Sequence, residues 1–251
     1  MSYDTVTQPA PPAPPRRSGG RTAARVAAVA LSLLLIAYGV LSLVGLIARD
    51  TAHRSATFGG VTGVTVDLGF ESLEVRGSST ASSVRMTRSY SWSFDRPSVR
   101  ASQAGGRLTV SSDCGFSVGR GCSGHVRLVL PEGLPVTVHT SDGSVLLRDL
   151  TGTVTSSTSD GHVTLRDLSG PVDASSSDGG IDLRFAGAPA RVQVRSHDGS
   201  IGVHVPHDGT SYRVTTDVSD GHEDVSVPAD PGAARRIDLE ASDGSITVDT
   251  R

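Results

Sequence analysis

Hydrophobic and polar residues alternate along many short segments in the second half of the chain. Segments such as Val136-Thr137-Val138 and Val163-Thr164-Leu165 place an apolar side chain at every second residue, with Thr, Ser, Asp or Arg in between. Alternation with a period of two is typical of strands that bury one face. The pattern therefore predicts an all-β fold built from many short strands.

At one position of the repeat, between two such segments, an Asp-Gly pair recurs six times, and the neighbouring residues recur with it. The Asp residues are 18, 18, 20, 22 and 23 residues apart. Apolar residues stand six positions before, and three and five positions after, each Asp, with Glu223 as the exception. A fixed period near twenty predicts a repeat protein whose copies stack on one another. The pairs are Asp142-Gly143, Asp160-Gly161, Asp178-Gly179, Asp198-Gly199, Asp220-Gly221 and Asp243-Gly244.

Two architectures fit this repeat. In a β-solenoid over residues 132–251, each copy is one coil and equivalent residues lie above one another; in a β-sandwich, the Asp-Gly pairs are the turns of antiparallel hairpins. We favour the solenoid because identical residues at a steady period indicate stacking of like on like. We expect Gly to supply a positive φ at the turns and Asp to bond its own turn. Glu223, at a core position, suggests that its coil bulges outward.

Residues 58–131 form a more irregular β region, expected to cap the stack. A strand within it carries apolar and aromatic residues on even positions, and this row could bind sugar rings or cover the end of the solenoid core. We expect it to cover the core. The row comprises Val84, Met86, Tyr90, Trp92 and Phe94.

Two cysteines lie in this region, Cys114 and Cys122, with a Gly-rich segment between them. Two Cys at this spacing in an exported domain predict a disulfide rather than a zinc site, which needs more ligands.

The N-terminal part predicts a membrane anchor. The run from Val26 to Ala48 contains 23 residues without a charge, long enough at about 1.5 Å per residue to cross a hydrocarbon core of roughly 30 Å. Four Arg precede it, which favours a cytoplasmic N-terminus. We expect a disordered Pro/Arg-rich tail over 1–22, a transmembrane helix over 23–48 and a linker over 49–57. The alternative is a cleaved signal peptide, whose apolar region is usually shorter.

Charge excludes one class of partner. Residues 1–49 carry a net charge of +4, so residues 50–251 carry −7 of the chain's total of −3. An acidic domain of this kind is not expected to bind nucleic acid.

The stacked Asp residues are the main chemical candidates. Carboxylates in a row repel unless donors or a cation neutralise them, so a Ca²⁺ ladder is conceivable, although we expect no cofactor and a structural turn. Asp160, Asp178 and Asp198 are nominal catalytic acids. Repeated residues usually serve the repeat, and the sequence contains none of the common hydrolase motifs, so we expect no enzyme.

The Ser-Asp-Gly-x-[Val/Ile] repeats that follow a single apolar span resemble the bacterial putative-adhesin β-strand-repeat family, built around a domain of unknown function. The resemblance covers about residues 58–249. It implies a surface-exposed, solenoid-like domain, in some cases linked to envelope stress, and carries over no catalytic residues.

These observations predict a single-pass protein of the cell membrane with its C-terminal domain outside the cell. We expect a non-enzymatic binding or adhesion module whose partner is an envelope protein, a glycan or its own copies. The alternative is a cell-wall glycan-active enzyme or an envelope-stress sensor. Self-association is expected at the last coil, near Val248.

Overall fold

The computed structural model describes residues 19–47, 50–92, 98–113 and 123–251. The chain divides into two compact units, Met1–Ile47 and Ala48–Arg251. The first unit contains one helix, α1, at Gly19–Ile47. It overlaps the segment 23–48, which was expected to be a transmembrane helix, and begins earlier, inside the predicted tail 1–22. The side chains of residues 25–39 are all exposed. In the described part of the chain, none of the helices combines the length and apolar character needed to span a bilayer.

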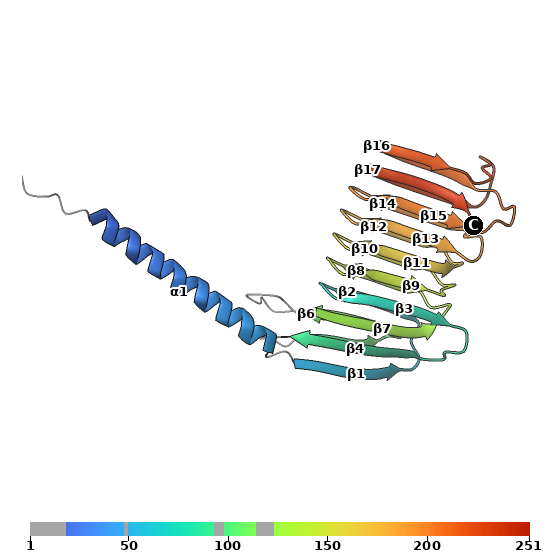
Figure 1. The fold of residues 1–251 in the computed structure, drawn as a ribbon. Helices are drawn as coiled ribbons and strands as arrows, with labels where there is room; N and C mark the ends of the chain where they lie inside the picture. The colour runs from blue at the N-terminus through green and yellow to red at the C-terminus, as the bar shows by residue number, and fades with distance from the viewer. Residues whose placement is uncertain (1–18, 48–49, 93–97, 114–122) are drawn as a thin grey trace, which may run out of the picture. The chain divides into compact units, whose positions relative to one another are not determined.

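The second unit is all-β (Figure 1), and its described residues form a 17-stranded sheet. The strands are β1 (Asp50–Phe58), β2 (Gly63–Leu68), β3 (Ser72–Ser78), β4 (Val84–Trp92), β5 (Ser98–Ala104), β6 (Arg107–Asp113), β7 (Ser123–Pro131), β8 (Val136–Thr140), β9 (Val145–Arg148), β10 (Val154–Thr158), β11 (Val163–Leu168), β12 (Val172–Ser176), β13 (Ile181–Phe185), β14 (Arg191–Ser196), β15 (Ile201–Val205), β16 (Arg213–Val225) and β17 (Arg236–Thr250).

Successive repeats stack in parallel, which confirms the solenoid over the hairpin sandwich. The strand before each Asp-Gly pair lies on its counterparts, so that Val136 aligns with Val154 and Val154 with Val172. The strand after the pair does the same, with Val163 between Val145 and Ile181. All six of these residues are buried in one hydrophobic core. One repeat is therefore one coil of two strands joined at an Asp-Gly corner.

The region before the clear repeats is more regular than expected at its centre. β2 and β3 form a coil parallel to β8 and β9, and β6 and β7 stack on the other side of that coil. Among the described strands, the antiparallel pairs are β1 with β4, β4 with β7 and β5 with β6, all at this end. β1 occupies the segment predicted as the linker 49–57, because it pairs with β4 along its whole length.

β4 carries the row of even-numbered apolar residues. Val84, Met86 and Tyr90 face the core and are buried, so for these residues the row covers the core and offers no surface to a sugar. The side chain of Trp92 and the whole of Phe94 lie outside the described residues, as do Cys114 and Cys122 with their predicted disulfide.

The order of the last two coils is reversed relative to the sequence. β17 pairs with β14 and β15 on one side and with β16 on the other. The chain therefore passes over one position to form β16 and then returns to fill the gap with β17, as the two top strands of Figure 1 show. Val248 is fully buried between β15 and β16, so the expected open edge at Val248 is wrong.

Candidate functional site: the aspartate column

The Asp-Gly corners stack as regularly as the strands that they join. In four of the corners, the backbone N–H of the Asp donates to the carbonyl oxygen of the residue before the Asp of the neighbouring coil, at 2.8 Å from Asp160 to Ser141 and 2.7 Å from Asp198 to Ser177. The N–H of Asp243 donates in the same way to His197, at 2.7 Å. These bonds place six exposed Asp side chains in one line, which we call the Asp column. In order along the stack its members are Asp142, Asp160, Asp178, Asp198, Asp243 and Asp220.

Glycine follows each Asp because there is no room for a side chain. A Cβ on Gly161 would lie 2.2 Å from the carbonyl oxygen of Gly143, and one on Gly179 would lie 2.0 Å from that of Gly161. The expected positive φ is absent from Gly143, Gly161, Gly179, Gly199 and Gly221; Gly244 alone of the six has one, at 153°. Positive φ occurs instead at Asp149 and Asp167, in the turn that leads to the next coil.

Hydroxyl side chains inside the corner hold the glycine. The N–H of Gly161 donates to Thr158 Oγ1 at 3.1 Å, and the same bond joins Gly179 to Ser176 at 2.9 Å. In the sequence, a Ser or Thr two residues before the Asp in the first four repeats is the signal for this bond. The predicted bond from each Asp to its own turn is not made in the column. Such bonds form in the inserted loops, where Asp208 accepts from Thr210 N and Asp230 from Gly232 N.

Neighbouring carboxyl groups in the column affect one another. The pKa of Asp142 is raised above its ordinary 3.8, mainly because its carboxyl shares a hydrogen bond with that of Asp160. A proton between two adjacent carboxyl groups relieves their mutual repulsion.

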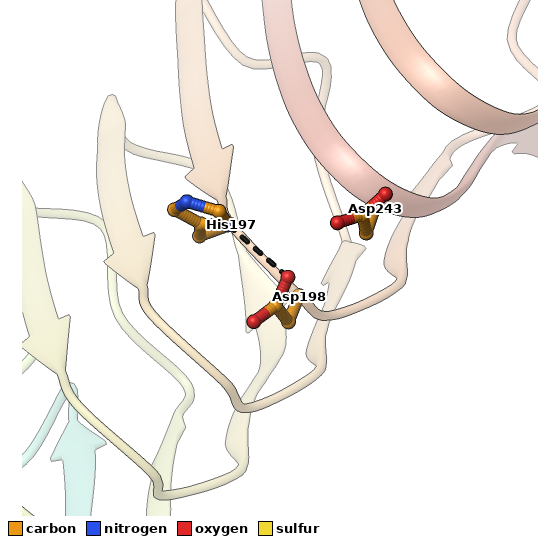
Figure 2. Close-up of side chains that lie close together, drawn as sticks. All are labelled: His197, Asp198 and Asp243. Carbon is orange, nitrogen blue, oxygen red and sulfur yellow. Dashed lines mark hydrogen bonds and ion pairs between the residues drawn. The ribbon is translucent and has the colours of Figure 1, made fainter.

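His197 changes this electrostatic environment on its coil (Figure 2). Its Nδ1 lies 3.1 Å from Asp198 Oδ1, and this hydrogen bond is the main cause of a raised His197 pKa and a lowered Asp198 pKa. Potential ligand atoms of His197, Asp198 and Asp243 lie within 4.8 Å of one another. All three residues are exposed, so the cluster offers a weak site for a cationic group rather than an enclosed metal centre.

The nominal catalytic acids do not converge. Asp160, Asp178 and Asp198 lie one on each of three successive coils, and only Asp198 has a His side chain bonded to it among the described residues. Hydrolysis by an acid pair would need two carboxyl groups with different pKa values on either side of the scissile bond of the substrate.

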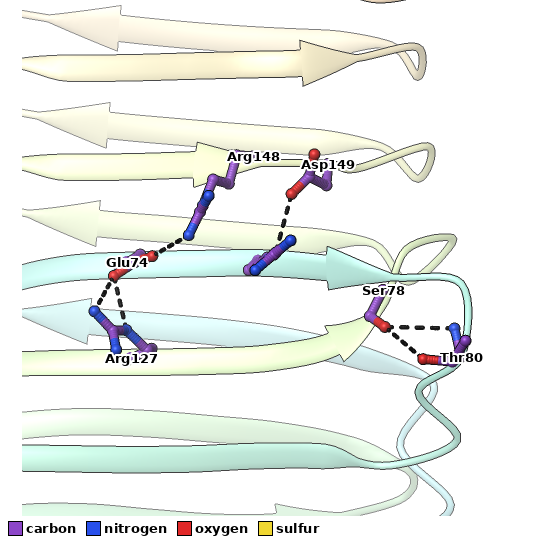
Figure 3. A network of polar contacts seen from close by, with 7 residues as sticks. Glu74, Ser78, Thr80, Arg127, Arg148 and Asp149 are labelled. Carbon is purple, nitrogen blue, oxygen red and sulfur yellow. Dashed lines mark hydrogen bonds and ion pairs between the residues drawn. The ribbon is translucent and has the colours of Figure 1, made fainter.

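A second polar cluster surrounds Glu74 on the outer face of β3 (Figure 3). Glu74 Oε2 accepts from Arg127 Nε at 2.7 Å and Oε1 from Arg148 Nη2 at 2.8 Å. Burial acts to raise the Glu74 pKa, but the bonds from Arg148 and Arg127 outweigh it and hold the pKa below its ordinary 4.5. The three residues come from three coils, so this cluster ties the irregular region to the first repeat. Sequence reasoning missed it because the partners lie 53 and 74 residues away.

A third cluster joins the later coils. His204 is only 7% exposed and lies between two carboxylates, with Nε2 at 3.4 Å from Asp182 and Nδ1 at 2.5 Å from Asp249. These residues belong to β13, β15 and β17, and the cluster therefore also ties β17 into its place in the stack.

Comparison with solved structures gives matches of low sequence identity. A putative cell adhesion protein from Clostridium sporogenes is 12% identical with a TM-score of 0.47, over 80% of this chain and all of the other. A putative adhesin from Parabacteroides merdae is 13% identical with a TM-score of 0.38, over 80% of this chain and 96% of the other. A putative adhesin from Bacteroides fragilis is 11% identical with a TM-score of 0.42, over 80% of this chain and 97% of the other. No curated protein matches this chain.

The family comparison covers the repeats. The model described as Toastrack DUF4097 matches residues 122–249, more than half of the chain, and this range contains every Asp-Gly corner. It extends from β7 to the last but one residue of β17 and so includes the coil that returns to fill the stack. The chain belongs to the Toastrack DUF4097 family.

Proposed function

We propose that this protein is a non-enzymatic binding or adhesion module that presents its stacked domain to another component of the cell envelope. The observation that carries the proposal is the Asp column, in which six exposed carboxylates repeat along a rigid stack. Neighbouring coils lie about 4.8 Å apart. Such a row matches an extended ligand with repeated positive or hydroxyl groups better than it matches one small substrate.

The fold supports this use of the column. In the first four corners, at Asp142, Asp160, Asp178 and Asp198, the glycine and the hydroxyl residue are buried, so this part of the row is held in place by the core rather than by a loop. A rigid array loses little conformational entropy when it binds, which favours recognition. The ligand is an envelope protein or a glycan.

Binding of the full chain to isolated envelope fragments tests the proposal. The test variant carries Asp142→Asn, Asp160→Asn and Asp178→Asn, which removes three charges from the column. The control carries Asp67→Asn, Asp173→Asn and Asp238→Asn, which removes three charges from the outer face of the first strands of three coils. We expect co-sedimentation of the control to match that of the unaltered chain and that of the test variant to fall severalfold.

Two further arms identify the ligand class and the alternative function. Protease treatment of the fragments abolishes binding if the ligand is a protein and preserves it if the ligand is a glycan. Equal binding by both variants would contradict a role for the column. Release of soluble sugar from purified cell wall would instead favour the alternative, a glycan-active enzyme.

We also propose that the domain needs no resident cofactor. The column carboxylates are exposed, and no buried ligand completes a cage around His197, Asp198 and Asp243 within the described residues. Addition of millimolar Ca²⁺ is expected to leave the unfolding midpoint unchanged. A rise that disappears in the Asp198→Asn variant would show that calcium binds there.

The third part of the proposal places the protein in the cell membrane, with residues 1–22 in the cytoplasm and the domain outside. Its support is the uncharged run from Val26 to Ala48 with four Arg before it, together with the exposed apolar side chains along α1. Protease added to intact cells is expected to digest the domain and spare a tag at residue 1. Digestion of the tag with protection of the domain would reverse this topology, and release of the protein by carbonate would argue against an anchor.

A further inference from the structure

The stack ends at β16, and this end is the one where a further strand could be added in continuation of the repeats. Among the described residues, β16 pairs with β17 alone, so one side of a 13-residue strand remains without a partner strand. Its inward residues Val214, Val218 and Val225 are only half-buried, although they align with the fully buried Ile237, Ala241 and Val248. The end of the core is therefore partly open. An unpaired edge over partly exposed apolar residues is a template for self-association.

Glu223 stands at the centre of this end. It aligns with Ile246 of β17 and so occupies an inward, core-facing position. The expected outward bulge is wrong, because β16 stays in register with β17 on both sides of Glu223. Thr216, which aligns with the buried Leu239, donates from Oγ1 to Glu223 Oε1 at 2.6 Å. The bond joins the two halves of β16 across the end of the core.

The equivalent position in the inner coils is always aliphatic. The residues there are Val145, Val163, Ile181, Ile201 and Ile246. A strand added to β16 would cover Glu223 as each inner coil covers its neighbour. The carboxylate would then lose water without gaining a cation, which is strongly unfavourable.

Other acidic residues of β16 also oppose the addition of a strand to this edge. Asp217, Asp220 and Asp224 are exposed along the same strand. In a symmetric pair of chains these carboxylates would approach their own copies, and like charges across paired strands are destabilising. The second copy is therefore the partner that this edge is best built to reject.

We propose that Glu223, held by Thr216, is a gatekeeper that keeps a second copy of this chain from pairing with β16. The inference does not depend on the binding role of the Asp column. Its consequence is that an aliphatic residue at this one position makes β16 resemble an inner coil and turns the end of the stack into an interface between copies.

Sedimentation of the full chain in detergent micelles over a range of concentrations tests the proposal with Glu223→Ile. The matched control is Asp173→Ile, which introduces the same side chain and removes the same charge on the outward face of the inner strand β12. We expect the unaltered chain and the control to share one mass. We expect Glu223→Ile to associate with an affinity at least about tenfold higher, and its β16 amides to gain protection from hydrogen exchange.

The outcomes separate the gatekeeper from a merely structural role. Thr216→Val keeps the carboxylate and is expected to remain unassociated even if it is less stable. Should Glu223→Ile fail to fold, Glu223→Gln removes the charge while it keeps an oxygen that Thr216 can bond, and it is expected to associate more than the unaltered chain. The proposal is overturned if the folded aliphatic or amide variant sediments like the unaltered chain, or if the unaltered chain already associates with its β16 amides protected.

Discussion

Glycine is needed at the corners for space rather than for backbone conformation. Gly161 has no positive φ, but a Cβ there would meet the Gly143 carbonyl oxygen at 2.2 Å and Thr158 Oγ1 at 2.7 Å. The backbone oxygen cannot move without breaking the stacking of the corner. A single methyl group is therefore expected to separate two coils locally.

The change Gly161→Ala is expected to cost roughly 2–4 kcal/mol of unfolding free energy, since overpacking of a tight site usually costs about 1–3 kcal/mol and a backbone bond is also strained. Denaturant unfolding measures it. Gly59→Ala is the control, because a Cβ at Gly59 meets nothing within 4 Å and its φ is not positive. Asp160→Asn is expected to be mild. A Gly161→Ala variant as stable as the control would contradict the steric explanation.

Glu74 gives the domain a stability that depends on pH. Its folded pKa lies below 4.5, so its contribution is complete above the unfolded pKa and is lost as the pH falls through the folded value. We expect Glu74→Gln to lower stability by roughly 1–2 kcal/mol at pH 7, because its Arg partners are partly exposed. The difference from the unaltered protein should shrink below about pH 4.5 in melts over a pH series. A difference that stays constant down to pH 3 would exclude the ion pairs as its cause.

The interaction of His197 depends on pH in the opposite direction from that of Glu74, because the His197 pKa is raised. The folded pKa of His197 is above 6.5 because Asp198 accepts a hydrogen bond from the imidazole. The favourable interaction is therefore complete below pH 6.5 and is lost as the pH rises through the folded pKa. An NMR titration is expected to give a pKa above 6.5 for this imidazole in the unaltered protein. In the Asp198→Asn variant, the pKa is expected to move back toward 6.5. If the titration is unchanged in that variant, Asp198 is not the partner.

At the level of elements, the sequence predicts the strands and corners of the regular coils correctly, because each core position is marked by an aliphatic residue at a fixed distance from Asp. The edge strand β1 was not predicted because Asp50–Phe58 has few apolar residues and depends on β4 for its hydrogen bonds. The exchanged positions of β16 and β17 could not be read from the spacing, since both copies carry the same pattern. Glu223 was the visible clue, because a charged residue in the core row fits only at an end.

This exchange makes β16 dependent on β17. Removal of residues 236–251 takes away the only described partner strand of β16 and exposes the edges of β14 and β15. We expect hydrogen exchange in the truncated chain to show loss of protection over Arg213–Val225, while β8 to β13 keep theirs. Retained protection of β16 would mean that it can pair directly with β14 and β15.

For the molecule as a whole, the column adds to the self-repulsion of an acidic domain. Residues 50–251 carry a net charge of −7, and six of the carboxylates stand in one exposed line. Salt screens exposed charges over about 10 Å at 0.1 M. We expect the thermal midpoint to rise between low and physiological ionic strength, and to rise less in the Asp142→Asn, Asp160→Asn, Asp178→Asn variant. Equal responses would show that the column is not the source of the repulsion.

The return of the chain into its own stack has a consequence for biosynthesis. A solenoid that simply grew from one end could fold coil by coil as it leaves the ribosome. Here β16 emerges from the ribosome before β17, the strand with which it pairs. The β16 segment therefore stays unpaired until residues 236–250 have also emerged. Any nascent chain that stalls within this interval presents an unprotected edge at β14 and β15 to proteases and chaperones. Closure of the domain is thus coupled to the synthesis of β17.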